Sequence, residues 1–327
     1  MKHTTAKLTA LILVLMLCFS LFGAQLSAGA SAEKPTVRIV VENKTYSVEN
    51  GAPWEGRILD EEVELKAGMN LLTVIESLLD SKNLAYRASE WGYLQEINGL
   101  AENALGNYGG WSITLNDWFT NEGATSYTVE NGGISDGDLI YVMYSCAWGG
   151  DLGSIWGDST TTLSSISFKG ATLDNDFDPA VTEYTLFADS SSIIVEPHAY
   201  NKNYQVRTYL NNYAPNDNGA EIKRTQPIEV KDDDVVFVGV GNCAWPTMNE
   251  AAEETVYKFN VVRVYSMGDV NRDGVVDVND VTYVQMYAAD LIEFDDEQFM
   301  HADFNMDNVV DISDATEIQM MIAVIDA

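Results

Sequence analysis

Two short stretches near the end of the chain repeat one spacing of acidic side chains. They read GDVNRDGVVDVNDV at 268–281 and ADFNMDNVVDISDA at 302–315. In an EF-hand loop, oxygens at positions 1, 3, 5, 7, 9 and 12 surround Ca²⁺, with position 7 contributing its backbone carbonyl. Both stretches match this pattern at every position. The sequence therefore predicts two Ca²⁺ ions, one held by Asp269, Asn271, Asp273, Val275, Asp277 and Asp280, the other by Asp303, Asn305, Asp307, Val309, Asp311 and Asp314.

Positions 6 and 12 depart from the loops of calcium sensors. The sharp turn at position 6 favours glycine, which Gly274 supplies in the first loop, whereas the second loop has Asn308. Asparagine adopts left-handed backbone angles more readily than most residues, so we expect the second loop to bind calcium only somewhat more weakly. Both loops carry Asp rather than Glu at position 12. This shorter side chain requires the backbone to lie closer to the ion.

The segments that flank the loops favour half of an EF-hand in each repeat. A complete EF-hand has one helix before the loop and one after it. Residues 257–264 alternate like a strand, so we expect no helix to enter the first loop. After the loops, apolar residues recur at the helical spacings of three and four, at Val281, Val284 and Ala288 and again at Ala315, Ile318 and Ile322. We therefore expect two loop–helix units, each without an entering helix.

This half-motif, repeated 34 residues apart within 266–327, resembles the type I dockerin family. The resemblance implies a small α-helical domain that binds a cohesin module of a scaffoldin and so assembles its chain into a cellulosome. It also implies that partner contacts come from loop positions 10 and 11 and from the exit helices, here Val278, Asn279, Gln285, Met286, Ile312, Ser313, Gln319 and Met320. Alternatively, the apolar members of this set pack the two repeats together. The Ser-Thr pair that the family carries at positions 10 and 11 is absent, which leaves the type of cohesin open.

Residues 1–32 have the features of a secretory signal peptide. Lys2 and Lys7 precede an apolar run at 8–22, and small residues follow. The run is shorter than the roughly 20 residues that span a membrane, and Leu17 before Cys18 does not fit a lipid-attachment site. The formal net charge of −32 repels nucleic acid and anionic membranes. We expect a secreted, extracellular, cellulosome-associated protein that neither inserts into a membrane nor binds nucleic acid.

Residues 33–146 favour a small α+β module. An amphipathic helix is predicted at 71–79, and strands are predicted at 36–42, 63–66, 93–97, 111–115 and 139–144. The stretches AGMNLLTVIESLL, GYLQEINGLAE, GGWSITLND and GISDGDLIYVMYS resemble the transcobalamin-like C-terminal domain family. The resemblance implies a β-grasp-like fold. We do not expect cobalamin binding, because the large helical domain that holds most of the ligand in transcobalamin has no counterpart in this sequence.

A Gly-, Ser- and Asp-rich stretch at 147–160 is typical of a linker, and an all-β module follows at 161–265. Strands are predicted there at 164–168, 183–187, 192–196, 235–240 and 256–264. The stretches LSSISFKGATLDNDFDPAVTEYTLF and VYKFNVVR resemble the bacterial cadherin-like β-sandwich family, which implies a spacer or interaction module. The segment PTMNEAAEE departs from the compact pattern of that family as an insertion. The chain is therefore predicted to be multidomain.

The cysteines and histidines outside the signal peptide form no recognisable catalytic or zinc motif. Cys146 and Cys243 either pair as a disulfide, which an exported chain can form, or remain buried thiols. His198 and His301 stand far apart, without a neighbouring His or Cys at zinc-binding spacing. A zinc site or a His-based catalytic triad is therefore disfavoured.

Tryptophans are frequent in the N-terminal half of the chain, at positions 54, 91, 111, 118, 148 and 156. Exposed indole rings can stack on sugars. Trp148 and Trp156 are the expected exposed pair, whereas core packing is the alternative for Trp111 and Trp91. A glycan is therefore a candidate second partner of the chain.

No pair of acids in the sequence identifies an active site. Glycoside hydrolysis needs two carboxylates at a set separation, and Glu90, Glu96 and Asp117 lie near tryptophans in the sequence. So acidic a chain offers many such pairs, however, and neither module resembles a hydrolase catalytic domain. We predict a non-catalytic cellulosome subunit that presents binding modules in polysaccharide degradation. The alternatives are a carbohydrate-active O-glycosyl hydrolase and a cell-surface adhesion protein.

Overall fold

The computed structural model describes residues 34–120, 122–215, 217, 220–224, 226–241 and 253–325. The predicted signal peptide and Cys243 lie outside these residues, as does most of the predicted insertion at 246–254. The described part of the chain is mostly β-sheet and contains four α-helices. Three of these helices follow one another in the C-terminal part, where the sequence predicts a helical domain.

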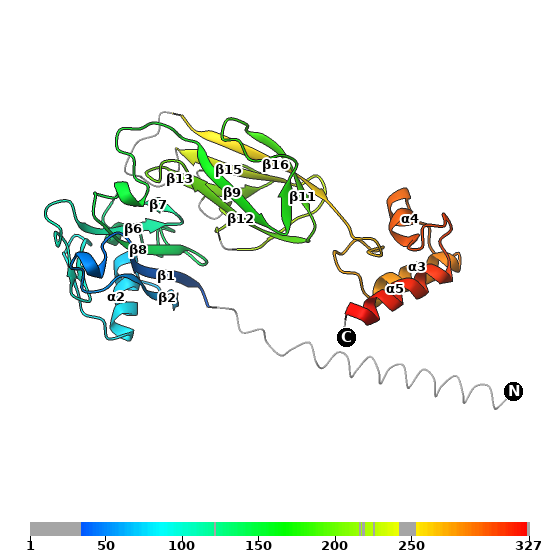
Figure 1. The fold of residues 1–327 in the computed structure, drawn as a ribbon, viewed down its shortest axis with the longest axis horizontal. Coiled ribbons are helices and arrows are strands. Elements are labelled where there is room, and N and C mark those ends of the chain that lie inside the picture. The colour runs from blue at the N-terminus through cyan, green and yellow to red at the C-terminus, as the bar shows by residue number, and fades with distance from the viewer. Residues whose placement is uncertain are drawn as a thin grey trace, which may run out of the picture. The chain divides into compact units, whose positions relative to one another are not determined.

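The first module is built on a five-stranded sheet with the strand order β2-β1-β8-β6-β7 (Figure 1). Its strands are β1 (Thr36–Asn43), β2 (Gly56–Glu64), β6 (Gly110–Leu115), β7 (Trp118–Phe119) and β8 (Leu139–Ser145). The central pair β1 and β8 is parallel, and the other neighbours are antiparallel. A smaller sheet contains β3 (Tyr86–Ala88), β4 (Leu94–Ile97) and β5 (Leu100–Ala101). Short 3-10 helices occupy Val48–Asn50, Ala124–Ser126 and Gly150–Leu152.

Helix α2 (Leu71–Ser81) covers the core of this module. Its apolar residues recur at helical spacing, and Leu71, Ile75 and Leu79 are fully buried together with residues of β1 and β8. A capping box starts the helix, because the Asn70 side chain accepts a hydrogen bond from the Thr73 N–H at 3.0 Å and the Thr73 hydroxyl accepts one from the Asn70 N–H at 2.9 Å. The helix predicted at 71–79 is thus confirmed.

Two sheets of the second module pack against a shared core (Figure 1). The five-stranded sheet has the order β10-β11-β16-β15-β13, and the three-stranded sheet has the order β14-β12-β9. Strand β12 alternates buried and more exposed residues, with Ile193 and Val195 facing the core, as expected for a strand with one covered face. The strands are β9 (Leu163–Lys169), β10 (Ala171–Leu173), β11 (Glu183–Ala188), β12 (Ser192–Ala199), β13 (Gln205–Leu210), β14 (Ile228–Glu229), β15 (Val235–Gly241) and β16 (Thr255–Arg263).

The C-terminal part consists of α3 (Val278–Ala288), α4 (Asp296–Ala302) and α5 (Ile312–Ile325). Helices α3 and α5 lie side by side (Figure 1), and Val281 and Val284 of α3 share a core with Ala315 and Ile318 of α5. Both exit helices are therefore present, and their predicted apolar faces pack against each other except at Ala288, which is exposed.

The expectation that neither loop has an entering helix is wrong for the second loop. Helix α4 ends directly before Asp303, the first residue of that loop. It is only seven residues long, too short to show a helical period in the sequence. Its signal is a capping box in which the Asp295 carboxylate accepts from the Gln298 N–H at 2.8 Å. The first loop follows strand β16 without an intervening helix, as predicted.

Asp117 stands in a two-residue turn between β6 and β7. Both Asn116 and Asp117 have positive φ, 49° and 76°, which is the geometry of a tight type I′ hairpin. The Asn116 side chain fixes the turn by donating to Asp138 Oδ1 at 2.8 Å and accepting from the Leu139 N–H at 2.9 Å. The turn thereby holds the Asp117 carboxylate, which is only 7% exposed, in one orientation.

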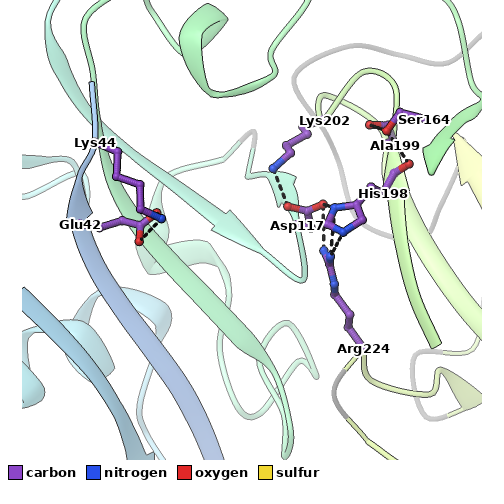
Figure 2. A network of polar contacts seen from close by, with 8 residues as sticks. All are labelled: Glu42, Lys44, Asp117, Ser164, His198, Ala199, Lys202 and Arg224. Carbon is purple, nitrogen blue, oxygen red and sulfur yellow. Dashed lines mark hydrogen bonds and ion pairs between the residues drawn. The ribbon is translucent and has the colours of Figure 1, made fainter. Parts of the chain in front are cut away.

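Three side chains of the second module surround this carboxylate (Figure 2). Lys202 Nζ lies 2.6 Å from Oδ1, while His198 Nδ1 and Arg224 Nη1 lie 3.0 Å and 2.8 Å from Oδ2. Arg224 Nη2 also lies 2.7 Å from His198 Nε2 and 3.0 Å from His198 Nδ1, so the guanidinium contacts both the carboxylate and the imidazole. Burial by itself raises the pKa of Asp117, but the His198 hydrogen bond and the Lys202 and Arg224 charges outweigh it and hold the pKa far below its usual value.

Residues 147–160, which have the composition of a linker, make hydrogen bonds to the second module. The Ser154 hydroxyl lies 2.9 Å from Asn203 Oδ1. The Asn201 side chain accepts from the Ile155 N–H at 3.1 Å and donates to the Ile155 carbonyl at 2.8 Å. These bonds fix the middle of the segment at its junction with the sheets.

Candidate calcium loops and docking surface

The first loop is closed by the residue at its last position. Asp280 is the third residue of α3. Its buried carboxylate accepts three hydrogen bonds from backbone N–H groups of the loop. Oδ1 accepts from the Val270 and Asn271 N–H groups at 2.8 Å and 3.0 Å, and Oδ2 accepts from the Asp277 N–H at 2.8 Å. The short Asp side chain at position 12 therefore holds the start of the loop close to the helix.

Asp269, at position 1 of the same loop, has one carboxylate oxygen without a partner. Its Oδ2 accepts from the Gly274 N–H at 2.9 Å, whereas its buried Oδ1 has no hydrogen-bond partner among the described residues. Burial raises the pKa of Asp269, and the nearby Asp280 and Asp273 carboxylates raise it further. A buried acceptor that lacks a donor is costly unless something positively charged approaches it. This observation fits the presence of a cation at the loop.

The second loop repeats the same contacts 34 residues later. Asp314 Oδ1 accepts from the Asn305 N–H at 3.2 Å and Oδ2 from the Asp311 N–H at 2.9 Å. Asp303 Oδ2 accepts from the Asn308 N–H at 2.9 Å, as Asp269 does from Gly274. Asn308 has φ of 65°, so it adopts the left-handed geometry that glycine has in the first loop. Both loops therefore have one architecture.

The aspartates at positions 5 and 9 of each loop accept a hydrogen bond from a nearby backbone N–H group through one carboxylate oxygen. Asp273 and Asp307 accept from the N–H two residues ahead at 3.0 Å and 2.9 Å, and Asp277 and Asp311 do so at 2.6 Å. In the part of the chain that the structure describes, no three or more His, Cys, Asp or Glu side chains lie together in an arrangement that could hold a metal ion. The loops thus present oxygen ligands in the motif's order, each oriented by the loop's own backbone.

Arg272, in the first loop, contacts the helix that enters the second. It is the single Lys or Arg of 267–327, against 15 Asp and Glu. Its guanidinium pairs with Asp295 and lies 3.5 Å from Glu297. This contact connects the first repeat to the start of α4. Sequence reasoning missed it, although a lone arginine among so many acids was a usable signal.

Most of the residues expected to contact a partner are on the surface. Met286 is half-buried, and the seven exposed ones are Val278, Asn279, Gln285, Ile312, Ser313, Gln319 and Met320. The core between the repeats instead contains Val270, Val281, Val284, Ala302, Val310, Ala315 and Ile318. The apolar side chains at Val278, Ile312 and Met320 are each at least 60% exposed. They are therefore available for an external partner.

Comparison with known protein families assigns two segments of the chain. Residues 267–323 match the Dockerin type I domain family. These residues are a type I dockerin domain. Residues 68–133 match a family described as a domain of unknown function, DUF4430. The dockerin match supports calcium binding and docking onto a cohesin module.

Matches to whole proteins add little to this assignment. A solved structure described as a "putative metal binding protein" from Ruminococcus gnavus ATCC 29149 is 16% identical and covers 34% of this chain and 97% of its own, with a TM-score of 0.22. No curated protein matches the chain. The described residues include no helix that is both long and apolar enough to cross a membrane.

The tryptophans of the N-terminal half divide into buried and exposed sets. Trp111 and Trp118 are buried in the first module, and Trp54 packs against Trp111 with ring centroids 5.9 Å apart. Trp148 and Trp156 are exposed, as predicted. The alternative that Trp91 packs in the core is wrong, because Trp91 is the most exposed aromatic residue among those described.

The cysteines and histidines that the sequence singles out do not form one site among the described residues. The Cys146 thiol lies 3.4 Å from the Thr45 carbonyl oxygen, and its pairing with Cys243 stays untested because Cys243 is outside the described residues. His198 belongs to the Asp117 network, and His301 packs edge-on against Tyr265.

Proposed function

We propose that the chain is a secreted, non-catalytic cellulosome subunit that docks onto a scaffoldin cohesin and presents its N-terminal modules to polysaccharide. The observation that carries this proposal is the dockerin, whose exit helices pack against each other and leave most of the partner-reading positions exposed. Asp117, one of the acids near a tryptophan, is held between cationic side chains, which fits a structural role rather than acid-base chemistry.

Two calcium ions complete the proposed docking domain. Asp269, Asn271, Asp273, Asp277, Asp280 and the Val275 carbonyl would hold the first ion, and Asp303, Asn305, Asp307, Asp311, Asp314 and the Val309 carbonyl the second. A bound ion supplies the positive charge that offsets the repulsion among these carboxylates. The residues of the chain then set the direction of each exit helix, because Asp280 and Asp314 belong both to a loop and to the first turn of a helix.

The two repeats offer nearly equivalent surfaces to a partner. Val278 corresponds to Ile312, Asn279 to Ser313, Gln285 to Gln319 and Met286 to Met320 at one constant offset. The pairs differ in exposure at one place only, because Met286 is half-buried and Met320 is 64% exposed. Such a surface supports docking through either repeat.

Changing Gln285 and Met286 to alanine together should change cohesin affinity by less than about threefold, since the second repeat keeps its own copies. Changing Gln319 and Met320 as well should lower the affinity by about a hundredfold or more, because both surfaces then lose their central side chains. Isothermal titration calorimetry measures both effects. The matched control is Met300→Ala on α4, an exposed methionine outside the set. Loss of binding in the first variant alone would refute docking through either repeat.

A pull-down of the mature protein against a panel of cohesins tests the proposal as a whole. Retention by at least one cohesin in the presence of calcium is the expected result. Failure of every cohesin to retain a folded protein would overturn the assembly role. Turnover of a polysaccharide by the same sample would overturn the non-catalytic part while leaving the docking part intact.

A further inference from the structure

A groove lined by aromatic side chains opens on the first module beside its junction with residues 147–160. It encloses about 440 Å³. Tyr108, Trp148 and Trp156 are 67%, 61% and 54% exposed along it, and the buried Trp111 forms part of its lining. Large aromatic side chains are rarely gathered on a surface without a binding role. Two of them come from the sequence segment that composition alone marks as a linker.

The exposed indoles are held in place by hydrogen bonds. Trp148 Nε1 donates to the Asn107 carbonyl at 2.9 Å, and Trp156 Nε1 donates to the Trp148 carbonyl at 3.3 Å. The rings of Tyr108 and Trp148 lie 6.3 Å apart between centroids. Because the polar edge of each indole is already bonded, its apolar faces remain available, and little rotamer freedom is left to lose on binding a ligand.

The backbone at Trp148 is held in an unfavourable conformation. Its φ of 53° is in the left-handed region, as is the φ of 83° at the following Gly149, but only the glycine adopts this region without strain. A bulky residue in this region costs roughly 1–3 kcal/mol. The side chain recovers little of this cost through burial, since most of it is exposed. This is the pattern of strain at a functional site rather than at a packing site.

The groove has no charged side chain in its lining, although 21% of the chain is Asp, Glu, Lys or Arg. Its polar side-chain groups are the amides of Asn103 and Asn107 and the hydroxyl groups of Ser112, Ser145, Tyr93 and Tyr108. The Asn103 and Asn107 amides make no side-chain hydrogen bond to any residue that the structure describes, so each has donors and an acceptor to offer. Such a surface suits a ligand that is neutral, has flat apolar faces, and both donates and accepts hydrogen bonds.

We propose that this groove binds a neutral polysaccharide, with sugar rings stacked on Trp148 and Trp156 and hydroxyl groups bonded to the Asn103 and Asn107 amides. A proline-rich peptide also fits aromatic grooves, but its backbone mostly accepts hydrogen bonds and would leave the amide oxygens unused. The site deepens the proposed presenting role of the N-terminal modules. It uses none of the dockerin residues, so sugar binding and cohesin docking can fail separately.

Affinity gel electrophoresis of the full mature protein tests the site. The gels contain hydroxyethyl cellulose, xyloglucan, arabinoxylan or galactomannan as neutral probes and polygalacturonate as an anionic one. At least one neutral polysaccharide should retard the protein, and polygalacturonate should not. Trp148→Ala and Trp156→Ala should each weaken the retardation by about tenfold or more, which corresponds to the loss of one stacking contact. The matched control is Phe187→Ala on β11, a partly exposed aromatic outside the groove, which should keep wild-type retardation.

Each remaining outcome contradicts the site. No retardation by any of the four neutral probes would overturn it, as would retardation that persists in the Trp148→Ala, Trp156→Ala double variant. Titration with a proline decapeptide forms a separate arm, and binding of that peptide which the double variant loses would assign the groove to a peptide instead. Unchanged cohesin binding and thermal denaturation of the variants exclude misfolding as the cause of a loss.

Discussion

Replacing Asp117 with alanine should lower the free energy of unfolding by about 3–5 kcal/mol. The Asp117 carboxylate is buried, and Lys202 and Arg224 donate to it across the junction between the first and second modules (Figure 2). The substitution would leave both cations near a buried site without their anion. Chemical denaturation followed by tryptophan fluorescence reports this loss, because Trp118 directly follows Asp117.

The control for this prediction is a surface carboxylate with a similar number of cationic partners. Asp60 pairs with Arg38 at 2.7 Å and with Arg57 at 2.6 Å on the exposed face of the first sheet. Asp60→Ala should cost less than about 1 kcal/mol, since solvent screens such pairs. Equal effects of Asp60→Ala and Asp117→Ala would show that burial of the Asp117 network does not matter for stability.

The same carboxylate gives the junction a predictable dependence on pH. Because the pKa of Asp117 is lower in the folded than in the unfolded chain, its stabilisation is fully present above about pH 4 and is lost as the pH falls towards the folded pKa. The difference in unfolding free energy between wild type and Asp117→Asn should therefore be largest near neutral pH and shrink below pH 4. A difference that stays constant from pH 7 down to pH 2.5 would contradict the ion-pair network.

None of this junction could be predicted from the sequence. His198 and Lys202 lie more than 80 residues from Asp117, and Arg224 lies further along the chain. A network of this kind has no local spacing that a sequence could display. Asp117 attracts attention in the sequence only as an acid near a tryptophan, which suggests catalysis, whereas the fold uses it to hold two modules together.

Features set by residues close together in the sequence, by contrast, could be predicted. The dockerin loops could be predicted because ligand spacing, turn residues and helix caps all fall within twelve residues. Strand β13 was missed because Gln205, Val206, Arg207, Thr208 and Tyr209 are all buried and show no alternation. Helix α4 was missed because seven residues are too few for a period, even though Asp295 and Gln298 have the spacing of a capping box. Sequence patterns therefore succeed where one face or one motif controls the segment.

Removing calcium with excess EDTA should lower cohesin affinity by about a hundredfold or more and reduce the helicity of the dockerin. An ion present at 100 times its dissociation constant stabilises the folded state by about 2.7 kcal/mol, a factor of about one hundred. The ion also offsets a charge excess that the domain does not otherwise balance, since one arginine faces 15 acids. The core has only seven buried residues among those described, all aliphatic, with aromatic side chains partly buried around them. Surface plasmon resonance and circular dichroism measure the two losses.

Single-loop variants separate the contributions of the two ions. Asp269→Ala and Asp303→Ala each remove the first ligand of one loop, and either should lower the calcium stoichiometry by one in titration calorimetry. Addition of calcium after EDTA should restore binding in wild type, and denaturation of the two N-terminal modules should not change with EDTA. Tight cohesin binding in excess EDTA would refute the calcium requirement.

The two docking surfaces should depend on each other, because α3 and α5 pack through Val281, Val284, Ala315 and Ile318. Disorder in either loop misplaces a helix that the other repeat needs. Loss of one ion should therefore weaken both docking surfaces.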